Sequence, residues 1–401
     1  MKSPISKVVD ANLCTGCGLC AGVFSPTAAS MALNEEGFLR PVQSRALNQA
    51  EAQLFDRICP GAGLQHPDRD NTFQALWGPI QTVMAGHAID DEVRFKGSSG
   101  GVLSALAIYL LETGLVQGVL HISVSEEHPF ENSIQLSTTR EDVLRAAGSR
   151  YAPASPLAEI NRYLAMPGQF AFIGKPCDVA ALRALQREKP EIEQKFPYLM
   201  SFMCAGTPSM KGTEAVVRHM GFEPEDVRQF RYRGNGWPGM ARAESKTGQA
   251  AEMDYEASWG TILNRYLQFR CKICPDGTGE FADVTCADAW HGDERGYPSF
   301  EESAGRSLIL GRTTKGAELI HQAILASGIK ARETQVDEIK RMQPYQVTRK
   351  QALIARLFGV RLAIKKIPKF KNMGLLEAAK IMPFKLHIRN AAGTWMRVFF
   401  K

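Results

Sequence analysis

Nine cysteines are the residues of this 401-residue chain best suited to carry chemistry. Cys14, Cys17 and Cys20 lie three residues apart, and Cys59 stands directly before Pro60. Three thiolates at this spacing can bind three corners of a cubane cluster, and a remote cysteine then binds the fourth iron. The alternative is structural zinc, which more often uses two Cys-x2-Cys pairs about 15 to 20 residues apart. This first cysteine set therefore predicts a 4Fe-4S cluster.

A second set of cysteines is spread over the middle of the chain. Cys177 and Cys204 each follow a predicted strand, at the position where α/β sheets place their ligands. Cys271 and Cys274 form a Cys-x2-Cys pair before a proline. These four residues could bind a second 4Fe-4S cluster, and Cys286 could replace one of them. The alternative for any single cysteine is that it binds no metal and serves only as a small buried apolar residue.

Glycine-rich turns close to the second set predict a phosphate-binding cradle. Residues 97–101 read Gly-Ser-Ser-Gly-Gly before a predicted helix, whose free N–H groups can receive a phosphate. Lys96, Arg150 and Lys175 stand beside such turns, although each could equally be the surface cation of an ordinary loop. Clusters pass single electrons and most organic substrates exchange two, so a converter is needed, and a flavin can do both.

Other motif matches carry less weight. Residues 234–239 match the Gly-x-Gly-x-x-Gly dinucleotide motif, but a tryptophan and a proline occupy the turn and no helix is predicted after it. Residues 97–101 also match the hydrolase motif around a nucleophilic Ser99, but no histidine stands in a triad pattern. Asp288 and His291 are acid candidates by position only, and a solvated loop is the alternative for both.

An α/β pattern from residue 79 onward must position these residues. Strands alternate with helices, which predicts a mixed, largely parallel sheet covered on both faces, whereas residues 1–75 read as irregular. The predicted strands are 118–124, 169–174, 198–204, 230–233 and 307–313. The predicted helices are 102–112, one capped at 139 that ends near 148, 178–188, one toward 219 and one toward 327.

Positive charge is concentrated at the C-terminus. The formal net charge is +6, yet residues 349–401 contain thirteen Lys or Arg and one acid, Glu377, so the other 348 residues sum to −6. Apolar and basic residues alternate there at roughly helical spacing. This pattern predicts helices that pack on the body with a solvated basic face, or that dock on anionic lipid or on an acidic redox partner.

Composition and termini narrow the class of protein. The acidic body and the lack of a groove-reading motif argue against a nucleic-acid partner. The sequence contains no run of about 20 apolar residues and no apolar leader. Clustered cysteines without such a leader predict a reducing compartment. We therefore expect a cytoplasmic protein, peripheral at a membrane if the tail docks there.

Several motifs give the chain a family resemblance. It resembles the coenzyme F420 hydrogenase/dehydrogenase beta-subunit family from about residue 10 to about residue 345. The resemblance implies a family of FAD-containing iron–sulfur oxidoreductases. This family includes deazaflavin-reducing hydrogenase subunits and ferredoxin-linked reductases that act on chlorophyll intermediates. The motifs occur in the family's order and read CTGCGLC, RFKGSSGG, GSRYAP, FIGKPCDVAAL, CAGTPS, FRYRGNGWPG and FRCKICPDG.

The resemblance implies FAD, two clusters and a redox activity. Such an enzyme would couple one-electron transfer with a ferredoxin-type partner to hydride transfer with a small organic substrate or with a deazaflavin such as coenzyme F420. The alternative is a non-catalytic electron-transfer subunit of a larger complex. The implied FAD residues are Ser98, Ser99, Gly100, Tyr151, Lys175 and Pro176.

The expected architecture has four parts. A ferredoxin-like iron–sulfur segment would precede a mixed α/β flavin-binding core, and a basic helical tail would follow it. The core would divide into an N-terminal region with the phosphate loop and a C-terminal region with the second cysteine set. The expected ranges are 1–75, 76–165, 166–345 and 346–401.

Overall fold

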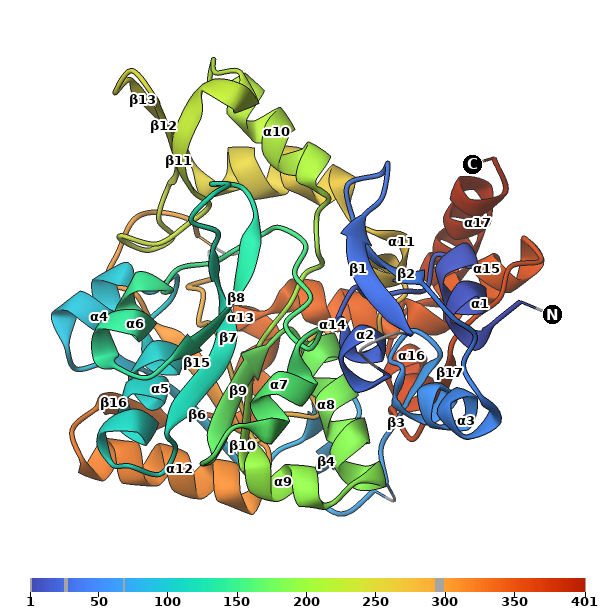
Figure 1. Ribbon diagram of the computed structural model, residues 1–401, viewed down its shortest axis with the longest axis horizontal. Coiled ribbons are helices and arrows are strands. Elements are labelled where there is room, and N and C mark those ends of the chain that lie inside the picture. The colour runs from blue at the N-terminus through green and yellow to red at the C-terminus, as the bar shows by residue number, and fades with distance from the viewer. Residues whose placement is uncertain (1, 25–27, 68, 293–298, 401) are drawn as a thin grey trace.

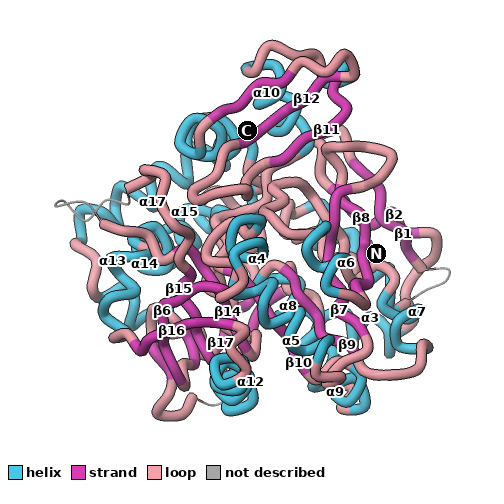
Figure 2. Tube along the Cα trace, turned by 90° about the vertical axis from the view of Figure 1, so that its left-hand side faces the viewer, coloured by secondary structure: helices cyan, strands magenta, loops and turns pink. Residues whose placement is uncertain are grey.

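An eight-stranded sheet forms the centre of the molecule in the computed structural model, which describes residues 2–24, 28–67, 69–292 and 299–400 (Figure 1). The strands lie in the order β16-β6-β15-β14-β10-β9-β7-β8. Figure 2 shows these strands side by side with helices around them. Their bounds are β6 Thr82–Ala88, β7 Gly118–Val124, β8 Asn132–Ser137, β9 Phe170–Gly174, β10 Tyr198–Phe202, β14 Val284–Asp288, β15 Ser307–Gly311 and β16 Ile329–Glu333.

The sheet is mixed as expected, but only its centre is parallel. The neighbours β7, β9, β10 and β14 run parallel to one another. The pairs β7–β8, β14–β15, β15–β6 and β6–β16 are antiparallel. Three pairings are thus parallel and four antiparallel, so the expectation of a largely parallel sheet is wrong. Parallel neighbours need a long crossover, usually a helix. The strand pairs β7/β8 and β14/β15 follow each other with no helix among the described residues between them.

Helices cover both faces of the sheet. Successive residues of a strand point to opposite sides, so β7, β9 and β10 each contribute side chains to both of the cores that these helices form with the sheet. In β9, Phe172 packs in the core that contains α8 (Pro176–Glu188). Its neighbour Ala171 packs in the core that contains α5 (Val102–Glu112) and α12 (Thr314–Leu325). The short helices around this core are α4 Asp91–Lys96, α6 Arg140–Arg145, α7 Ile160–Ala165 and α9 Glu191–Lys195.

Most of the predicted elements lie close to their expected bounds. The helix predicted at 102–112 and the strand at 118–124 have those bounds. α6 begins after a capping box in which Thr139 and Asp142 exchange hydrogen bonds. Local capping and hydrophobic patterning are sufficient signals here, because these elements are long or clearly punctuated.

The N-terminal segment is not irregular, which corrects that expectation. It forms three helices and a β-hairpin before residue 60. The first two helices and the two strands have five to seven residues each, which is too short to show a clear periodicity. The third helix begins with a capping box of Asn48 and Glu51 and is amphipathic, so the prediction overlooked a local signal there. Phe55 and Ile58 of this third helix are buried in the core that contains α8. The bounds are α1 Pro4–Asp10, α2 Leu19–Val23, β1 Ala29–Leu33, β2 Leu39–Gln43, α3 Gln49–Ile58, β3 Gly63–Gln65, β4 Phe73–Gln74 and β5 Gly78–Pro79.

A small lobe beyond the sheet carries a second, three-stranded sheet (Figure 1). The motif at 234–239 leads into one of its strands rather than into a helix, which confirms that it is no dinucleotide fingerprint. The elements of this part are α10 Met210–His219, β11 Val227–Arg231, β12 Ala241–Ser245, β13 Ala250–Met253 and a π-helical turn Glu256–Ile262. The short helix α11 Phe269–Lys272 follows this part in the chain.

The C-terminal tail is helical, as expected, and packs on the body. Its strand β17 pairs in parallel with β3 of the N-terminal segment, so the tail and the N-terminal segment lie side by side (Figure 1). Among the described residues, no helix has the length and apolarity needed to cross a bilayer. The elements are α13 Ile339–Met342, α14 Pro344–Gln351, α15 Leu353–Leu362, β17 Lys369–Lys371, α16 Leu375–Lys380 and α17 Phe384–Phe399.

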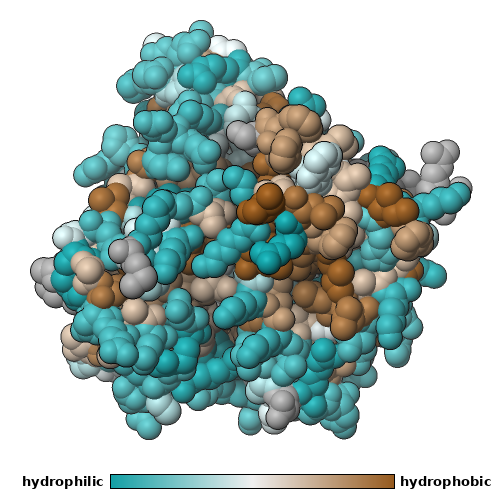
Figure 3. Space-filling view, turned by 90° about the vertical axis from the view of Figure 1, so that its right-hand side faces the viewer, coloured by the Kyte–Doolittle hydropathy of each residue, from teal (hydrophilic) through white to brown (hydrophobic). Residues whose placement is uncertain are grey.

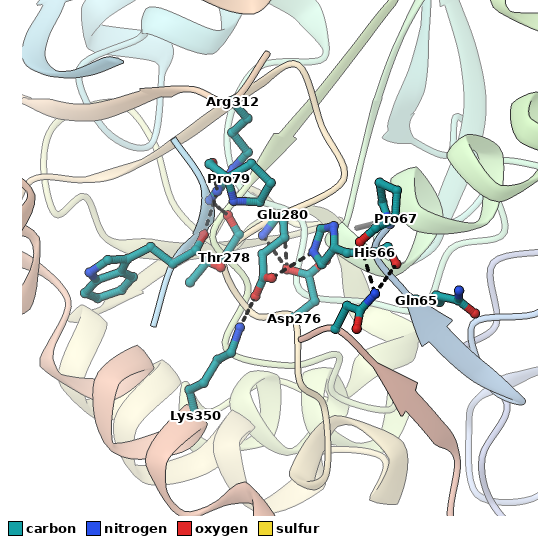
Figure 4. A network of polar contacts seen from close by, with 12 residues as sticks. Gln65, His66, Pro67, Pro79, Asp276, Thr278, Glu280, Arg312 and Lys350 are labelled. Atoms are coloured by element: carbon teal, nitrogen blue, oxygen red, sulfur yellow. Dashed lines mark hydrogen bonds and ion pairs between the residues drawn. The ribbon is translucent and has the colours of Figure 1, made fainter. Parts of the chain in front are cut away.

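A buried ionic network fastens the start of the tail to the interior (Figure 4). The Glu280 carboxylate is paired with the Lys350 ammonium, and its other oxygen lies 3.0 Å from Nε2 of His66. Burial alone would raise the pKa of Glu280, but Lys350 and His66 outweigh it and the pKa is lowered. The network joins α14, the N-terminal segment and the loop before β14, so the first turns of the tail belong to the core.

Candidate functional site

The carboxyl ends of the parallel strands open on a cavity of about 1770 Å³. Lys175 follows β9, Cys204 follows β10 and Asp288 ends β14, and all three line this cavity. Parallel sheets commonly bind ligands at this edge. The volume exceeds the few hundred to about 1,000 Å³ of common ligand pockets, so it has room for a cofactor and a substrate together.

The four residues of the first cysteine set come together around a small apolar cavity. All four line it, together with side chains of α1 and α3. Cys14 and Cys17 lie on the loop that enters α2, Cys20 lies in the first turn of α2, and Cys59 is the C-cap of α3. Residues 39 positions apart therefore meet because α3 packs beside that loop.

Backbone N–H groups point at each sulfur of the first set. Gly16 donates to Sγ of Cys14 at 3.4 Å, and the N–H of Leu19 bonds Cys17. Ala21 bonds Cys20 in the same way, and Gly61 and Ala62 both bond Cys59. Such donors stabilise cluster thiolates and tune the cluster's potential.

The electrostatics of the first set fit a polynuclear cation. Burial and the neighbouring Cys14 together raise the pKa of Cys59 to about 12. The pKa of Cys17 is raised by burial, by Asp178 and by Cys59. Four crowded thiols would thus stay protonated on their own, and a cationic core is what allows them to ionise.

The described residues include no close group of ligands for a single metal ion. Within residues 2–24, 28–67, 69–292 and 299–400, no three His, Cys, Asp or Glu side chains are close enough to share one ion. The structure therefore gives no support to structural zinc. A cubane binds each thiolate to a different iron, so it requires wider spacing between the sulfurs.

The second cysteine set also comes together, at the edge of the large cavity. Burial, together with Cys271 and Cys274, raises the pKa of Cys204 to about 12. Cys177 interacts electrostatically with Cys204 and Cys271. Thr207 N–H donates to Sγ of Cys271 at 3.4 Å, which repeats the N–H to sulfur pattern of the first set.

Buried cations surround the second set. The Arg349 guanidinium donates to the carbonyl oxygens of Cys204, at 2.8 Å, and of Cys271. Arg270 lowers the pKa of Cys274 and also that of Cys59 in the first set. The Nε atoms of both arginines are buried and have no hydrogen-bond partner among the described residues. These buried positive charges would suit an anionic thiolate-bound cluster.

Cys286, the possible substitute ligand, is separate from both sets. It lies within β14 and is 5% exposed, in the core with α5 and α12. Burial alone raises its pKa to about 12, with no other thiol contributing. The geometry therefore favours Cys177, Cys204, Cys271 and Cys274 as the set of four.

Gln268 links the two cysteine sets, and sequence reasoning missed it. Its Nε2 lies 3.3 Å from Sγ of Cys271 and 3.4 Å from the carbonyl oxygen of Thr15, within the first cysteine loop. Its Oε1 accepts from Arg40 at 3.1 Å. The side chain is buried, so the bridge is shielded from water. Only its place three residues before Cys271 could have signalled it.

Three of the predicted flavin residues line the cavity in a way that fits a phosphate-bearing ligand. Ser98 Oγ is buried without a partner among the described residues, at the loop before α5. Lys175 is 9% exposed and pairs with Asp178 at 2.8 Å. Tyr151 forms an aromatic wall with Trp259, with ring centroids 4.6 Å apart. An unpartnered hydroxyl, a cation and aromatic rings are typical of a dinucleotide site.

Other predicted residues have different neighbours. Ser99 Oγ bonds the backbone of Arg306 and Ser307 Oγ, both at 3.0 Å, although Ser99 also borders the cavity. Gly100 N–H donates to Ser307 Oγ. These contacts give both residues a role in fastening the loop to β15.

The remaining two cations and Pro176 also have structural contacts. Arg150 borders the cavity, but its guanidinium donates to Oδ1 of Asn132 and to three backbone carbonyls. Lys96 pairs with Glu92 at the surface. Pro176 is buried at the first turn of α8. Neither Lys96 nor Pro176 lines the cavity.

An aromatic group around a buried ion pair forms another part of the cavity and was not predicted. Arg233 binds both carboxylate oxygens of Asp288, at 2.7 and 2.9 Å. Its guanidinium lies over the rings of Tyr255, at 4.7 Å, and Trp290, at 5.2 Å. Trp237 stacks on Trp290 and donates to Asp288 at 2.6 Å. Asp288 is therefore no solvated loop residue, whereas His291 is exposed.

The first cysteine loop requires a glycine at position 18, because the φ of Gly18 is +83° and a side chain there would collide with the backbone of a neighbouring loop. A Cβ there would lie 2.8 Å from the backbone N of Ala158. We expect Gly18→Ala to cost about 1–2 kcal/mol from the left-handed backbone alone and to displace the loop, so iron of the first set is lost on gel filtration. Gly114→Ala is the matched control, since Gly114 has φ +70° and open space around it. Equal iron retention in both variants would contradict the expectation.

Family models match most of the chain outside its two ends. The model for the N-terminal part of the coenzyme F420 hydrogenase/dehydrogenase beta subunit matches residues 83–161. The model for the C-terminal part of the same protein matches residues 168–337. The second cysteine set lies inside these matches, whereas the first set and the tail lie outside them.

Individual relatives agree with the family models. The chain is 28% identical over 270 residues to the beta subunit of coenzyme F420 hydrogenase from Methanococcus voltae, covering 66% of this chain and 88% of the relative. It is 24% identical over 364 residues to coenzyme F420-dependent sulfite reductase from Methanocaldococcus jannaschii. That match covers 86% of this chain but only 50% of the reductase.

A solved structure shares the fold. It is a chain of the F420-reducing [NiFe] hydrogenase complex from Methanosarcina barkeri, with a TM-score of 0.54 and 21% identity. The similarity covers 74% of this chain and 97% of that one.

Proposed function

Because this chain belongs to the coenzyme F420 hydrogenase/dehydrogenase beta-subunit family, we propose that it is an FAD-dependent iron–sulfur oxidoreductase. It would exchange electrons between a ferredoxin-type partner and coenzyme F420 or another small organic substrate. The relatives named as F420-dependent hydrogenase and sulfite reductase support the deazaflavin. Bound FAD supplies the conversion between one-electron and two-electron exchange.

The observation that carries the proposal is the arrangement of two neighbouring four-cysteine sets, the second of which lies at the edge of the large cavity. Cys204 and Cys271 of the second set border the cavity. Gln268 connects that set to the loop of the first. A cluster held by the first set would lie toward the surface segments at the chain ends, and one held by the second set would lie between it and the cavity. This order suits a relay from an external partner to a ligand in the cavity.

The residues around the cavity have distinct proposed tasks. Ser98 and Lys175 would bind the phosphates of FAD, because one has an unpartnered hydroxyl and the other a buried positive charge. Tyr151 and Trp259 would pack against a ring system. The Arg233–Asp288 pair would hold the aromatic group of Tyr255, Trp290 and Trp237 in place. The organic substrate would bind in the part of the cavity that this group lines.

The test is an anaerobic preparation of the full chain. We expect about eight irons and a matching amount of acid-labile sulfide per chain, as two 4Fe-4S clusters require, together with about one released FAD. With reduced ferredoxin or a reduced viologen dye, the protein should bleach the visible absorbance of coenzyme F420. A colourless preparation without flavin and iron would overturn the proposal.

A second candidate is a non-catalytic electron-transfer subunit. The relatives that are named as subunits and the hydrogenase complex favour it. In that case the clusters and FAD would be present, but the isolated chain would neither reduce nor oxidise coenzyme F420. Activity that appears only after a purified partner is added would favour this second candidate.

A further inference from the structure

The tail leaves an unusually apolar surface exposed on α15, α17 and the turns beside them. Ile364 is 91% exposed, Phe384 76% and Phe400 76%. Large exposed apolar patches on a protein mark interaction sites. We call this surface the C-terminal face, and Figure 3 shows apolar side chains gathered on the side of the molecule that carries these helices. Its exposed apolar residues are Phe358, Leu362, Ile364, Ile381, Phe384, Leu386, Ile388, Met396, Phe399 and Phe400.

Helix α17 shows that this exposure follows a pattern. The only buried residue of the helix is Thr394. Ile388, Met396 and Phe399 are about half exposed or more, and they lie at offsets of eight and three residues on one side of the helix. α17 packs against α15 with its other side, so the fold itself has no partner for this stripe among the described residues.

The charge around the apolar residues has one sign. The only acid between 349 and 401 is Glu377, and it pairs with Arg69 at 2.8 Å. Cations adjoin the exposed apolar residues directly, as in Ile364-Lys365-Lys366 and Phe384-Lys385. The exposed basic residues of the tail are Lys365, Lys366, Lys369, Lys371, Lys380, Lys385, Arg361, Arg389 and Arg397.

These properties distinguish between the possible occupants. A second copy of the chain would bring two strongly positive faces together, which like charges oppose. Protein interfaces are depleted of Lys and enriched in Arg, whereas six of the nine exposed cations here are Lys. A bilayer with anionic headgroups complements both features, because lysines meet the phosphates while the apolar side chains enter the acyl boundary.

We propose that the C-terminal face binds the surface of an anionic phospholipid bilayer, with Ile381 and Phe384 inserted and Lys365 and Lys366 at the headgroups. This inference goes beyond the proposed redox function and does not depend on it. The N-terminal segment lies beside the tail through the β3–β17 pairing, so the bound protein would hold its first cysteine set close to the membrane.

The test is co-sedimentation of the full, anaerobically purified chain with lipid vesicles. We expect binding to phosphatidylcholine vesicles that contain phosphatidylglycerol, little binding to pure phosphatidylcholine, and release by high salt. Lys365→Gln/Lys366→Gln should weaken binding about 25-fold, since each lysine near such a surface contributes about a factor of five. Ile381→Ser/Phe384→Ser should weaken it at least about tenfold.

A matched control and a folding check complete the test. Leu325→Ser/Lys330→Gln alters one exposed apolar residue and one exposed lysine outside the tail, and it should bind like the parent chain. Circular dichroism melting shows that each variant is folded. The proposal is overturned if the parent chain fails to bind anionic vesicles, or binds neutral ones equally well. A solution dimer that Phe384→Ser dissociates would assign the face to a second copy and also overturn it, as would loss of vesicle binding in the control.

Discussion

Cys17→Ser is expected to leave a chain with about four irons instead of about eight, with its FAD retained. Cys17 is buried at the centre of the first set, next to Cys14 and Cys59. A serine hydroxyl is a far poorer ligand for iron than a thiolate, so the first cluster should not assemble. Turnover driven by reduced ferredoxin should fall to background, because that partner is proposed to deliver electrons to the first set. Iron analysis and the visible spectrum measure the loss.

Cys286→Ser is the matched control for this prediction. Cys286 is also a buried cysteine, but no other thiol contributes to its pKa. We expect the control to keep all of its iron, with at most a moderate loss of stability from a hydroxyl placed in an apolar core. If Cys286→Ser lost iron and Cys17→Ser did not, the grouping of the cysteines into two sets would be wrong.

Arg233→Met is expected to destabilise the protein by about 3–5 kcal/mol, because it leaves the Asp288 carboxylate without its partner in a largely buried place. Arg233 is 2% exposed and binds both oxygens of Asp288. The free energy of unfolding from urea denaturation measures the effect. The substitution should also disturb the aromatic group, since Tyr255 and Trp290 pack on the guanidinium.

Two further variants separate the causes. Arg233→Met/Asp288→Asn removes the unpaired charge and keeps an acceptor for Trp237, so it should recover most of the lost stability. Arg242→Met breaks an ion pair with Glu252 in which both side chains are about 40% exposed. Exposed pairs contribute at most about 1 kcal/mol. If Arg242→Met lowered the free energy of unfolding as much as Arg233→Met does, burial of the Arg233–Asp288 pair would not be the cause of the large effect.

The fold could be predicted where local signals are strong. β9 and α8 follow the pattern of an apolar strand, a turn and an amphipathic helix, and both lie at their expected places. The sheet order could not be predicted in the same way. β15 lies between β14 and β6, although β6 is distant in sequence, and such pairings depend on long-range packing. The first two N-terminal helices were missed because helices of five to seven residues show no clear periodicity, and the third was missed although it carries a capping box.

The site divides along a similar line. Spacing and residue type selected the cysteines, since thiolates in regular spacing have few other uses in a reducing compartment. The choice between Cys286 and the other middle cysteines required the structure. The structure was also needed to identify the hydrogen-bond partners of Arg150 and Ser99. A cation or a hydroxyl beside a glycine turn binds whichever acceptor lies within reach, including the protein's own backbone.

The order of residues along the chain was enough to determine the family, the α/β class and the helical, basic tail, because these depend on composition, local patterning and motif identity. Only the folded chain decided that Gln268 bridges the two cysteine sets, that Arg233 and Asp288 meet inside an aromatic group, and that α17 turns an apolar stripe outward. The first two are contacts between residues far apart in sequence, and the third depends on which side of α17 packs against α15. All three follow from how whole elements pack, which no local pattern encodes.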